Sequence, residues 1–178
     1  MDETKVILVD EYDNPVGVME KIEAHRKGLL HRAISVFIIN ARGEWLLQKR
    51  AMDKYHSMGL WTNACCTHPL PGEPEEESAL RRLNEEMGMR CSLRKLFDFI
   101  YRERMDNDLI EYEFDHVFIG VTDEDPLINR SEVDDWKRLS FTEIQKDIEV
   151  NPGDYTFWFK EIYKEVNEHI INTKNNEL

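Results

Sequence analysis

The chain has 178 residues, a length that suits one domain with a proper hydrophobic core. It carries 36 acidic and 23 basic side chains and a formal net charge of −13, so it repels phosphate backbones and no nucleic-acid partner is expected. With 41% hydrophobic and 33% charged residues, the composition is that of a soluble globular protein and excludes a disordered chain.

The N-terminal third predicts strands separated by turns. Residues 5–9 form a strand-like run, and a turn follows at 13–15. Residues 20–27 fit either a short helix or an irregular loop that ends at Gly28. Residues 33–48 predict a β-hairpin, because a β-branched run is followed by a turn at 40–43 and a second apolar segment.

The rest of the chain adds three helices and three strands. Residues 74–87 predict a helix, with three glutamates at its positive end, an apolar stripe and a terminating Gly88. The further strands and helices are expected at residues 93–104, 109–121 and 136–139 and at 142–150 and 154–172. This order predicts a mixed α/β sandwich, in which helices pack on a sheet.

The sequence shows neither a membrane-spanning segment nor a secretory signal, so we expect a cytoplasmic protein with no membrane contact. Apolar runs such as residues 36–39 are strand-sized, well below the roughly 18 residues of a membrane-spanning helix. Residues 1–5 lack the basic-then-apolar layout of a secretory signal. Three cysteines, of which Cys65 and Cys66 are adjacent, form no disulfide framework and favour a reducing compartment.

Two glutamates on one predicted strand are the first candidates for chemistry. Glu111 and Glu113 are two residues apart, so their side chains share one face of a strand. Two carboxylates this close repel each other unless a cation or a proton lies between them. A solvated strand face is the ordinary explanation for such a pair, and a metal or acid–base site is the alternative.

Six histidines could supply further metal ligands: His25, His31, His56, His68, His116 and His169. None has the four-residue spacing of a helical two-histidine site. His25 and His31 lie on either side of Gly28, which permits them to converge. Spacing alone leaves a histidine–glutamate metal site and ordinary structural histidines both open.

Two further groupings have a functional and a structural interpretation. In an extended segment Cys66 and His68 point to the same side. They could be an acid–base thiol beside a metal ligand, or they could simply pack in the core. Arg82 and Glu86 share a helix face, where they form a surface ion pair or hold a phosphate and a divalent ion. Three upstream cations could serve the same anion or be solvated charges: Lys21, Arg50 and Lys54.

Five segments follow one another in an order and spacing typical of a known family. They are E-K-I-E-A-H at 20–25, L-L-H-R-A at 29–33, Q-K-R-A-M-D-K at 48–54, W-T-N-A-C-C-T-H-P at 61–69 and E-Y-E at 111–113. Together they resemble type I isopentenyl diphosphate isomerase, over residues 6–158. The resemblance implies a Nudix-type α/β/α sandwich, a single domain over residues 1–178 and a cytoplasmic enzyme of isoprenoid precursor synthesis.

The resemblance also implies roles for individual residues. The metal ligands would be His25, His31, His68, Glu111 and Glu113, around one Mn²⁺, Zn²⁺ or Fe²⁺ ion. Cys66 resembles the essential thiol, and Glu113 with Tyr101 resembles the acid–base pair on the opposite face. The residues around the substrate would be Glu86 as the carboxylate that helps to hold Mg²⁺, the basic Lys21, Arg50, Lys54 and Arg82 at the diphosphate, and Trp158 over the hydrocarbon end.

The implied reaction interconverts isopentenyl and dimethylallyl diphosphate, by adding a proton to the alkene and removing another on the opposite side. The partner would be this small diphosphate, and the enzyme would be a monomer or weak homodimer. Two alternatives are a Nudix hydrolase of nucleoside or other diphosphates and a non-enzymatic metal-binding interaction domain. Arg82 argues against the hydrolase, because the hydrolase signature has a metal-binding Glu at that position. His56 and His116 match no functional position and are expected to be structural.

Overall fold

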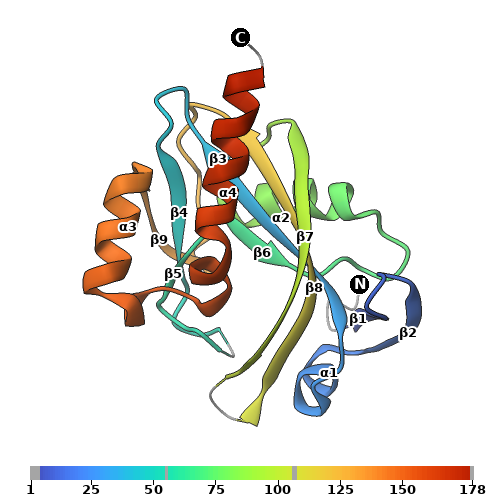
Figure 1. Ribbon diagram of the computed structural model, residues 1–178. Coiled ribbons are helices and arrows are strands. Elements are labelled where there is room, and N and C mark those ends of the chain that lie inside the picture. The colour runs from blue at the N-terminus through green and yellow to red at the C-terminus, as the bar shows by residue number, and fades with distance from the viewer. Residues whose placement is uncertain (1–4, 55, 106–107, 177–178) are drawn as a thin grey trace.

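The computed structural model describes residues 5–54, 56–105 and 108–176, the last three of them by their backbone alone. Within these residues one mixed sheet lies between two helical layers (Figure 1). Helix α2 (Glu75–Met87) covers one face, and helices α3 (Phe141–Val150) and α4 (Phe157–Asn176) cover the other. This arrangement confirms the predicted α/β sandwich. None of the helices in the described ranges is long and apolar enough to cross a membrane.

The centre of the sheet is a parallel pair of strands. The strands are β1 (Lys5–Val9), β2 (Pro15–Glu20), β3 (His31–Ile39), β4 (Trp45–Arg50), β5 (Trp61–Thr62), β6 (Cys65–Thr67), β7 (Leu93–Arg104), β8 (Ile110–Val121) and β9 (Val133–Leu139). Strand β3 runs parallel to β8 along its whole length and pairs antiparallel with short stretches of β1, β6 and β4. Strand β7 lies antiparallel on the outer side of β8. Strands β6 and β8 therefore flank β3.

The two helical layers are held by alternate side chains of the buried strand β3. Phe37 and Ile39 pack with residues of α3 and α4 in one core cluster. Ile34, Val36 and Ile38 pack with residues of α2 in a second cluster. Because successive strand side chains point to opposite faces, a continuous run of apolar residues fits a strand covered on both sides.

The ends of α1 (Lys21–Lys27) and α2 follow from local chemistry. The Glu20 carboxylate accepts a hydrogen bond from the Glu23 amide at the start of α1, which settles residues 20–27 as a helix. Gly28 ends α1 with a φ of 59°, and Gly88 ends α2 with a φ of 63°. A Cβ at Gly88 would lie 2.6 Å from the Leu127 carbonyl oxygen, so a larger residue cannot replace it without moving the backbone.

Several elements differ from the sequence prediction. The short strands β5 and β6 were not predicted, and β9 begins at Val133 rather than at residue 136. Strand β2 was not predicted, because it is an edge strand with little buried surface, and its only apolar alternation is the exposed pair Val16 and Val18. Helix α4 begins at Phe157 rather than at residue 154. Pro152–Asp154 form a separate 3₁₀ turn, and Tyr155 is extended because it pairs with Trp61.

Candidate active site

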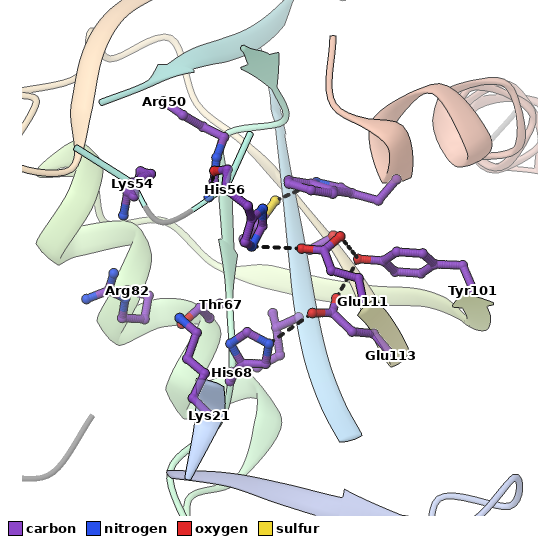
Figure 2. A pocket seen from close by; sticks show the side chains of 14 residues that line it. Lys21, Arg50, Lys54, His56, Thr67, His68, Arg82, Tyr101, Glu111 and Glu113 are labelled. Atoms are coloured by element: carbon purple, nitrogen blue, oxygen red, sulfur yellow. Dashed lines mark hydrogen bonds and ion pairs between the residues drawn. The ribbon is translucent and has the colours of Figure 1, made fainter. Parts of the chain in front are cut away.

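One pocket collects side chains from both halves of the chain. Its lining comprises Lys21, Ile34, Ser35, Arg50, Lys54, His56, Cys66, Thr67, His68, Arg82, Tyr101, Glu111, Glu113 and Trp158 (Figure 2). Ten of the predicted site residues are in this set. His25 and His31 are fully buried and contact it, whereas Glu86 is not part of the lining.

The sheet register explains how distant residues meet. The parallel pairing of β3 with β8 sets His31 beside Glu113, and the antiparallel pairing of β7 with β8 sets Tyr101 on the other side of Glu113. Strand β6 places Cys66 beside Ser35 of β3. The thiol and the carboxylate therefore reach the pocket from strands on either side of β3.

Four of the five predicted metal ligands form one compact group. The nearest ligand atoms of His25, His31, His68 and Glu113 all lie within 4.8 Å of one another. Oε1 of Glu113 is 3.0 Å from Nε2 of His68 and 3.5 Å from Nε2 of His31. This set of imidazole and carboxylate donors is one that divalent transition metals bind.

The hydrogen bonds behind two of the imidazoles suit metal binding. Nδ1 of His25 lies 2.7 Å from the Lys21 carbonyl oxygen, and Nδ1 of His31 lies 2.8 Å from the Leu29 carbonyl oxygen. Carbonyl oxygens only accept, so each Nδ1 carries the hydrogen and Nε2 is the nitrogen that could bind a metal. Burial lowers the pKa of His25 to about 4, which keeps its ring neutral.

The two glutamates of β8 are buried side by side and share the Tyr101 hydroxyl. That hydroxyl lies 2.6 Å from Glu113 and 3.2 Å from Glu111. Burial and the Glu113 charge raise the pKa of Glu111 well above its ordinary value. Burial also opposes ionisation of Glu113, but contacts with His31 and His68 outweigh it and hold that pKa well below its usual range. A divalent cation would relieve the repulsion between the carboxylates, so the residues present fit one.

The fifth predicted ligand, Glu111, lies beside this group rather than within it. It belongs to a second set with His25 and His56, and its Oε1 is 2.9 Å from Nε2 of His56 (Figure 2). His56, which was expected to be structural, lines the pocket, a location that the sequence did not predict. No spacing rule indicates this position, since its contact with Glu111 spans 55 residues of the chain.

Cys66 is held as a thiol between two polar side chains. Its Sγ donates to Asn63 Oδ1 at 3.1 Å and accepts from the Trp158 indole N–H at 3.0 Å. Burial, and then the nearby Asp115, raises the pKa of Cys66 to about 12. The neighbouring Cys65 is instead packed in the α2 core cluster. The two adjacent cysteines thus have different surroundings.

The predicted basic residues all line the pocket and form a positive wall in an acidic chain. In Figure 2, Lys21, Lys54 and Arg82 lie on the side away from Tyr101. Burial, followed by the charges of Lys54 and Arg50, lowers the pKa of Lys21 to about 8. Lys54 and Arg82 both pair with Glu132, a residue that the sequence did not single out.

Glu86, the predicted magnesium ligand, lies behind this wall. Arg82 Nη2 is 2.6 Å from its Oε1, and Gln48 Nε2 donates to its Oε2 at 3.1 Å. Arg82 and Glu86, four residues apart on the helix, therefore form a partly buried ion pair rather than a solvated surface one. In this structure an arginine occupies the position that a cation would take at Glu86.

Two further titratable residues of strand β8, Asp115 and His116, have different surroundings. Asp115 continues the two-residue alternation of Glu111 and Glu113 and accepts a hydrogen bond from Ser35 at 2.7 Å, so that alternation could have revealed it. His116 lies outside the pocket, with Nδ1 2.8 Å from Asp98 and Nε2 3.2 Å from Asp13. Together with Asp13 and Glu75, His116 forms a separate group of possible metal ligands, so its structural role stays a prediction.

Comparison with known proteins identifies the family. Residues 29–159 match the NUDIX domain family. The isopentenyl-diphosphate Delta-isomerase of Pectobacterium atrosepticum is 54% identical over 157 residues, which are 88% of each chain. Isopentenyl-diphosphate Delta-isomerase 2 of Photorhabdus laumondii is 52% identical over 162 residues, or 91% of each chain. This chain belongs to the isopentenyl-diphosphate Delta-isomerase family. The family inferred from the five sequence segments is confirmed.

Solved structures agree on the fold of this isomerase family member. A Deinococcus radiodurans protein aligns with a TM-score of 0.69 at 21% identity, over 82% of this chain and 89% of its own. A MutT protein of Methanosarcina mazei aligns with a TM-score of 0.64 at 17% identity, over 78% of this chain and 94% of its own. At these identities the likeness establishes the Nudix fold alone.

Proposed function

We propose that this isomerase interconverts isopentenyl and dimethylallyl diphosphate with two proton-transfer groups, Cys66 and the Tyr101–Glu113 pair. One observation carries the proposal: a thiol and a tyrosine-bound carboxylate, from strands on either side of β3, line the same pocket as four basic side chains. An acid and a base at two places in one enclosed site are what a proton shift along three carbons requires.

The chemistry explains why two groups are needed. An unactivated alkene is a very poor base, and its protonation at the terminal carbon generates a tertiary carbocation. A second proton must then leave the carbon next to the oxygen-bearing one, and water must be kept from the cation. Because the reaction is reversible, the group that gives a proton in one direction accepts it in the other. Cys66 and Glu113 are the groups proposed for these two roles.

Trp158 is proposed to cover the hydrocarbon end of the substrate. Its indole is only 3% exposed, lines the pocket and donates its N–H to Cys66. An aromatic face over a developing cation contributes on the order of 2 kcal/mol when water is excluded. The same ring therefore orients the thiol and stabilises the positive charge.

The diphosphate is proposed to bind the basic wall of Lys21, Arg50, Lys54 and Arg82. The alkene end offers little binding energy, so these contacts must supply most of it. For a Mg²⁺ ion that accompanies the diphosphate, Glu86 is the proposed carboxylate, and it would exchange its contact with Arg82 for the ion. Hydrolysis is disfavoured because Arg82 stands where the hydrolase signature has a metal-binding Glu, so one carboxylate that would hold a catalytic ion is replaced by a cation.

A transition-metal ion, Mn²⁺ or Zn²⁺, is proposed to bind His25, His31, His68 and Glu113, with Glu111 completing the set. When bound, the ion supplies a fixed positive charge that orients the carboxylates and strengthens a proton donor hydrogen-bonded to them. Tyr101, whose hydroxyl contacts both carboxylates, is the donor in that position.

The test measures conversion between the two diphosphates by purified protein supplied with Mg²⁺ and Mn²⁺. We expect Cys66→Ser and Glu113→Gln each to lose roughly 10²- to 10⁴-fold in kcat, the usual contribution of a general acid or base. Cys65→Ala is the matched control, since its thiol packs in the α2 core and its removal should leave kcat unchanged. A fully active Cys66→Ser enzyme would refute the role of the thiol.

A further inference from the structure

The segment between β4 and β5 brings His56 into the pocket. Its side chain is 4% exposed and lines the same cavity as the proposed catalytic groups (Figure 2). Arg50 fixes the backbone here, because Nη2 donates to the His56 carbonyl and Nε donates to the Ser57 carbonyl, both at 3.2 Å. The backbone that carries the imidazole is therefore held by one of the cations of the basic wall.

The contacts of the imidazole define which nitrogen carries the hydrogen. Nε2 of His56 lies 2.9 Å from Glu111 Oε1, and Nδ1 lies 3.1 Å from the Ser57 hydroxyl. With a metal bound, Glu111 would be ionised and its oxygens would only accept hydrogen bonds, so Nε2–H of His56 would be the donor in the metal-bound protein. Nδ1 then accepts from the Ser57 hydroxyl. Ser57 has a φ of 49°, so this hydroxyl is presented from a backbone conformation that is uncommon for serine.

Glu111 is consequently held at both carboxylate oxygens. His56 binds Oε1, and the Tyr101 hydroxyl lies 3.2 Å from Oε2. The carboxylate is 2% exposed, so water does not compete for these contacts. His25 belongs both to the group that contains Glu111 and His56 and to the neighbouring group of metal ligands. A carboxylate fixed in this way needs little reordering to complete a metal site.

We propose that His56 is a positioning residue that orients Glu111 toward the metal. The proposal rests on the proposed function for the identity of that site. His56 acts through Glu111, and its backbone contact with Arg50 couples the basic wall to the metal ligands. The imidazole therefore sets the affinity of the pocket for the ion.

The test is binding of Mn²⁺ alone to metal-free protein, with the unbound ion measured by its electron paramagnetic resonance signal. We expect His56→Ala to weaken the Kd for Mn²⁺ by about 10- to 100-fold, as loss of a residue that orients a ligand typically does. His56→Gln keeps an N–H donor and should recover affinity to within a few-fold of the wild type. Ser57→Ala removes only the hydroxyl at Nδ1 and should give a smaller loss in the same direction.

His169→Gln is the control, because His169 stacks on Phe97 at a centroid distance of 5.0 Å, lies outside the pocket and belongs to none of the groups of possible metal ligands among the described residues. It should leave the Kd for Mn²⁺ unchanged. Activity provides a second readout: raising Mn²⁺ should restore much of the kcat of His56→Ala, with the KM for the diphosphate little altered. Thermal unfolding checks that each variant is folded. If His56→Ala does not fold, His56→Gln and Ser57→Ala still test the inference.

Wild-type Mn²⁺ affinity in His56→Ala would overturn the inference. So would a His56→Gln enzyme as weak as His56→Ala, because the hydrogen bond would then not be the cause. Failure of the proposed function has a different signature, in which the wild type binds Mn²⁺ but does not interconvert the two diphosphates. A wild type that binds no Mn²⁺ would overturn the metal site and the role of His56 together.

Discussion

Replacing Tyr101 by Phe removes one oxygen from the buried junction between the two glutamates. The ring is retained, and it still stacks on Phe99 at a centroid distance of 5.3 Å and packs near Phe157 at 6.0 Å. The lost contacts are those of 2.6 Å to Glu113 and 3.2 Å to Glu111. A hydrogen bond to a charged group is worth about 1.5–3 kcal/mol, so an interaction used in the transition state corresponds to a fall in kcat of about 10- to 150-fold.

The assay compares kcat at saturating isopentenyl diphosphate and saturating Mn²⁺. Tyr112→Phe is the matched control, because it also removes one phenol oxygen. Tyr112 belongs to the neighbouring residue pair of the β7–β8 ladder, where it packs against Arg102 outside the pocket. We expect the control to keep its kcat and both variants to remain folded at the assay temperature. If Tyr101→Phe also kept full activity, the hydroxyl would have no part in proton transfer and the proposed pair would be reduced to Glu113 alone.

Three further outcomes are expected. Trp158→Phe should lower kcat by about tenfold, because a phenyl ring keeps only part of the ~2 kcal/mol of cation stabilisation and lacks the N–H that binds Cys66; an unchanged kcat at saturating substrate would contradict this. The pKa of Lys21 is about 8, so its cation is present below that pH and lost above it, and kcat/KM should fall as pH rises through about 8. Lys21→Arg keeps its charge and should move this fall to higher pH, whereas coincident profiles would exclude Lys21 as its origin. Phe159→Ala should lower the free energy of unfolding by about 3–5 kcal/mol in a denaturant titration, since Phe159 is fully buried in the α4 core; a loss below about 1 kcal/mol would show that this core is not well packed.

Local patterns were sufficient for most of the fold. The helix at 74–87 and the strands at 93–104 and 109–121 were predicted to within one residue, because each has a strong period and a clear terminator. The shared face of Glu111 and Glu113 also followed from strand geometry alone. Strand β2 was missed, since an exposed edge strand has no buried face to pattern its sequence.

The site itself depends on pairings that no local pattern contains. His31 meets Glu113 only because β3 and β8 run parallel in one register, and that register links residues 82 positions apart. Family resemblance, rather than spacing, supplied this set of residues. His56 shows the limit of both approaches, because it matches no recognised functional position of the family and its contact with Glu111 arises from the fold of the segment between β4 and β5.

The most direct test of two separate proton-transfer groups is turnover of isopentenyl diphosphate in deuterium oxide. If Cys66 and the Tyr101–Glu113 pair act independently, the proton that is added comes from a group that has exchanged with solvent. Product from a single turnover should then carry one deuterium in its new methyl group. Conversion with no deuterium in that methyl group would mean that one residue carries the same proton from carbon to carbon, and it would contradict the two-group account.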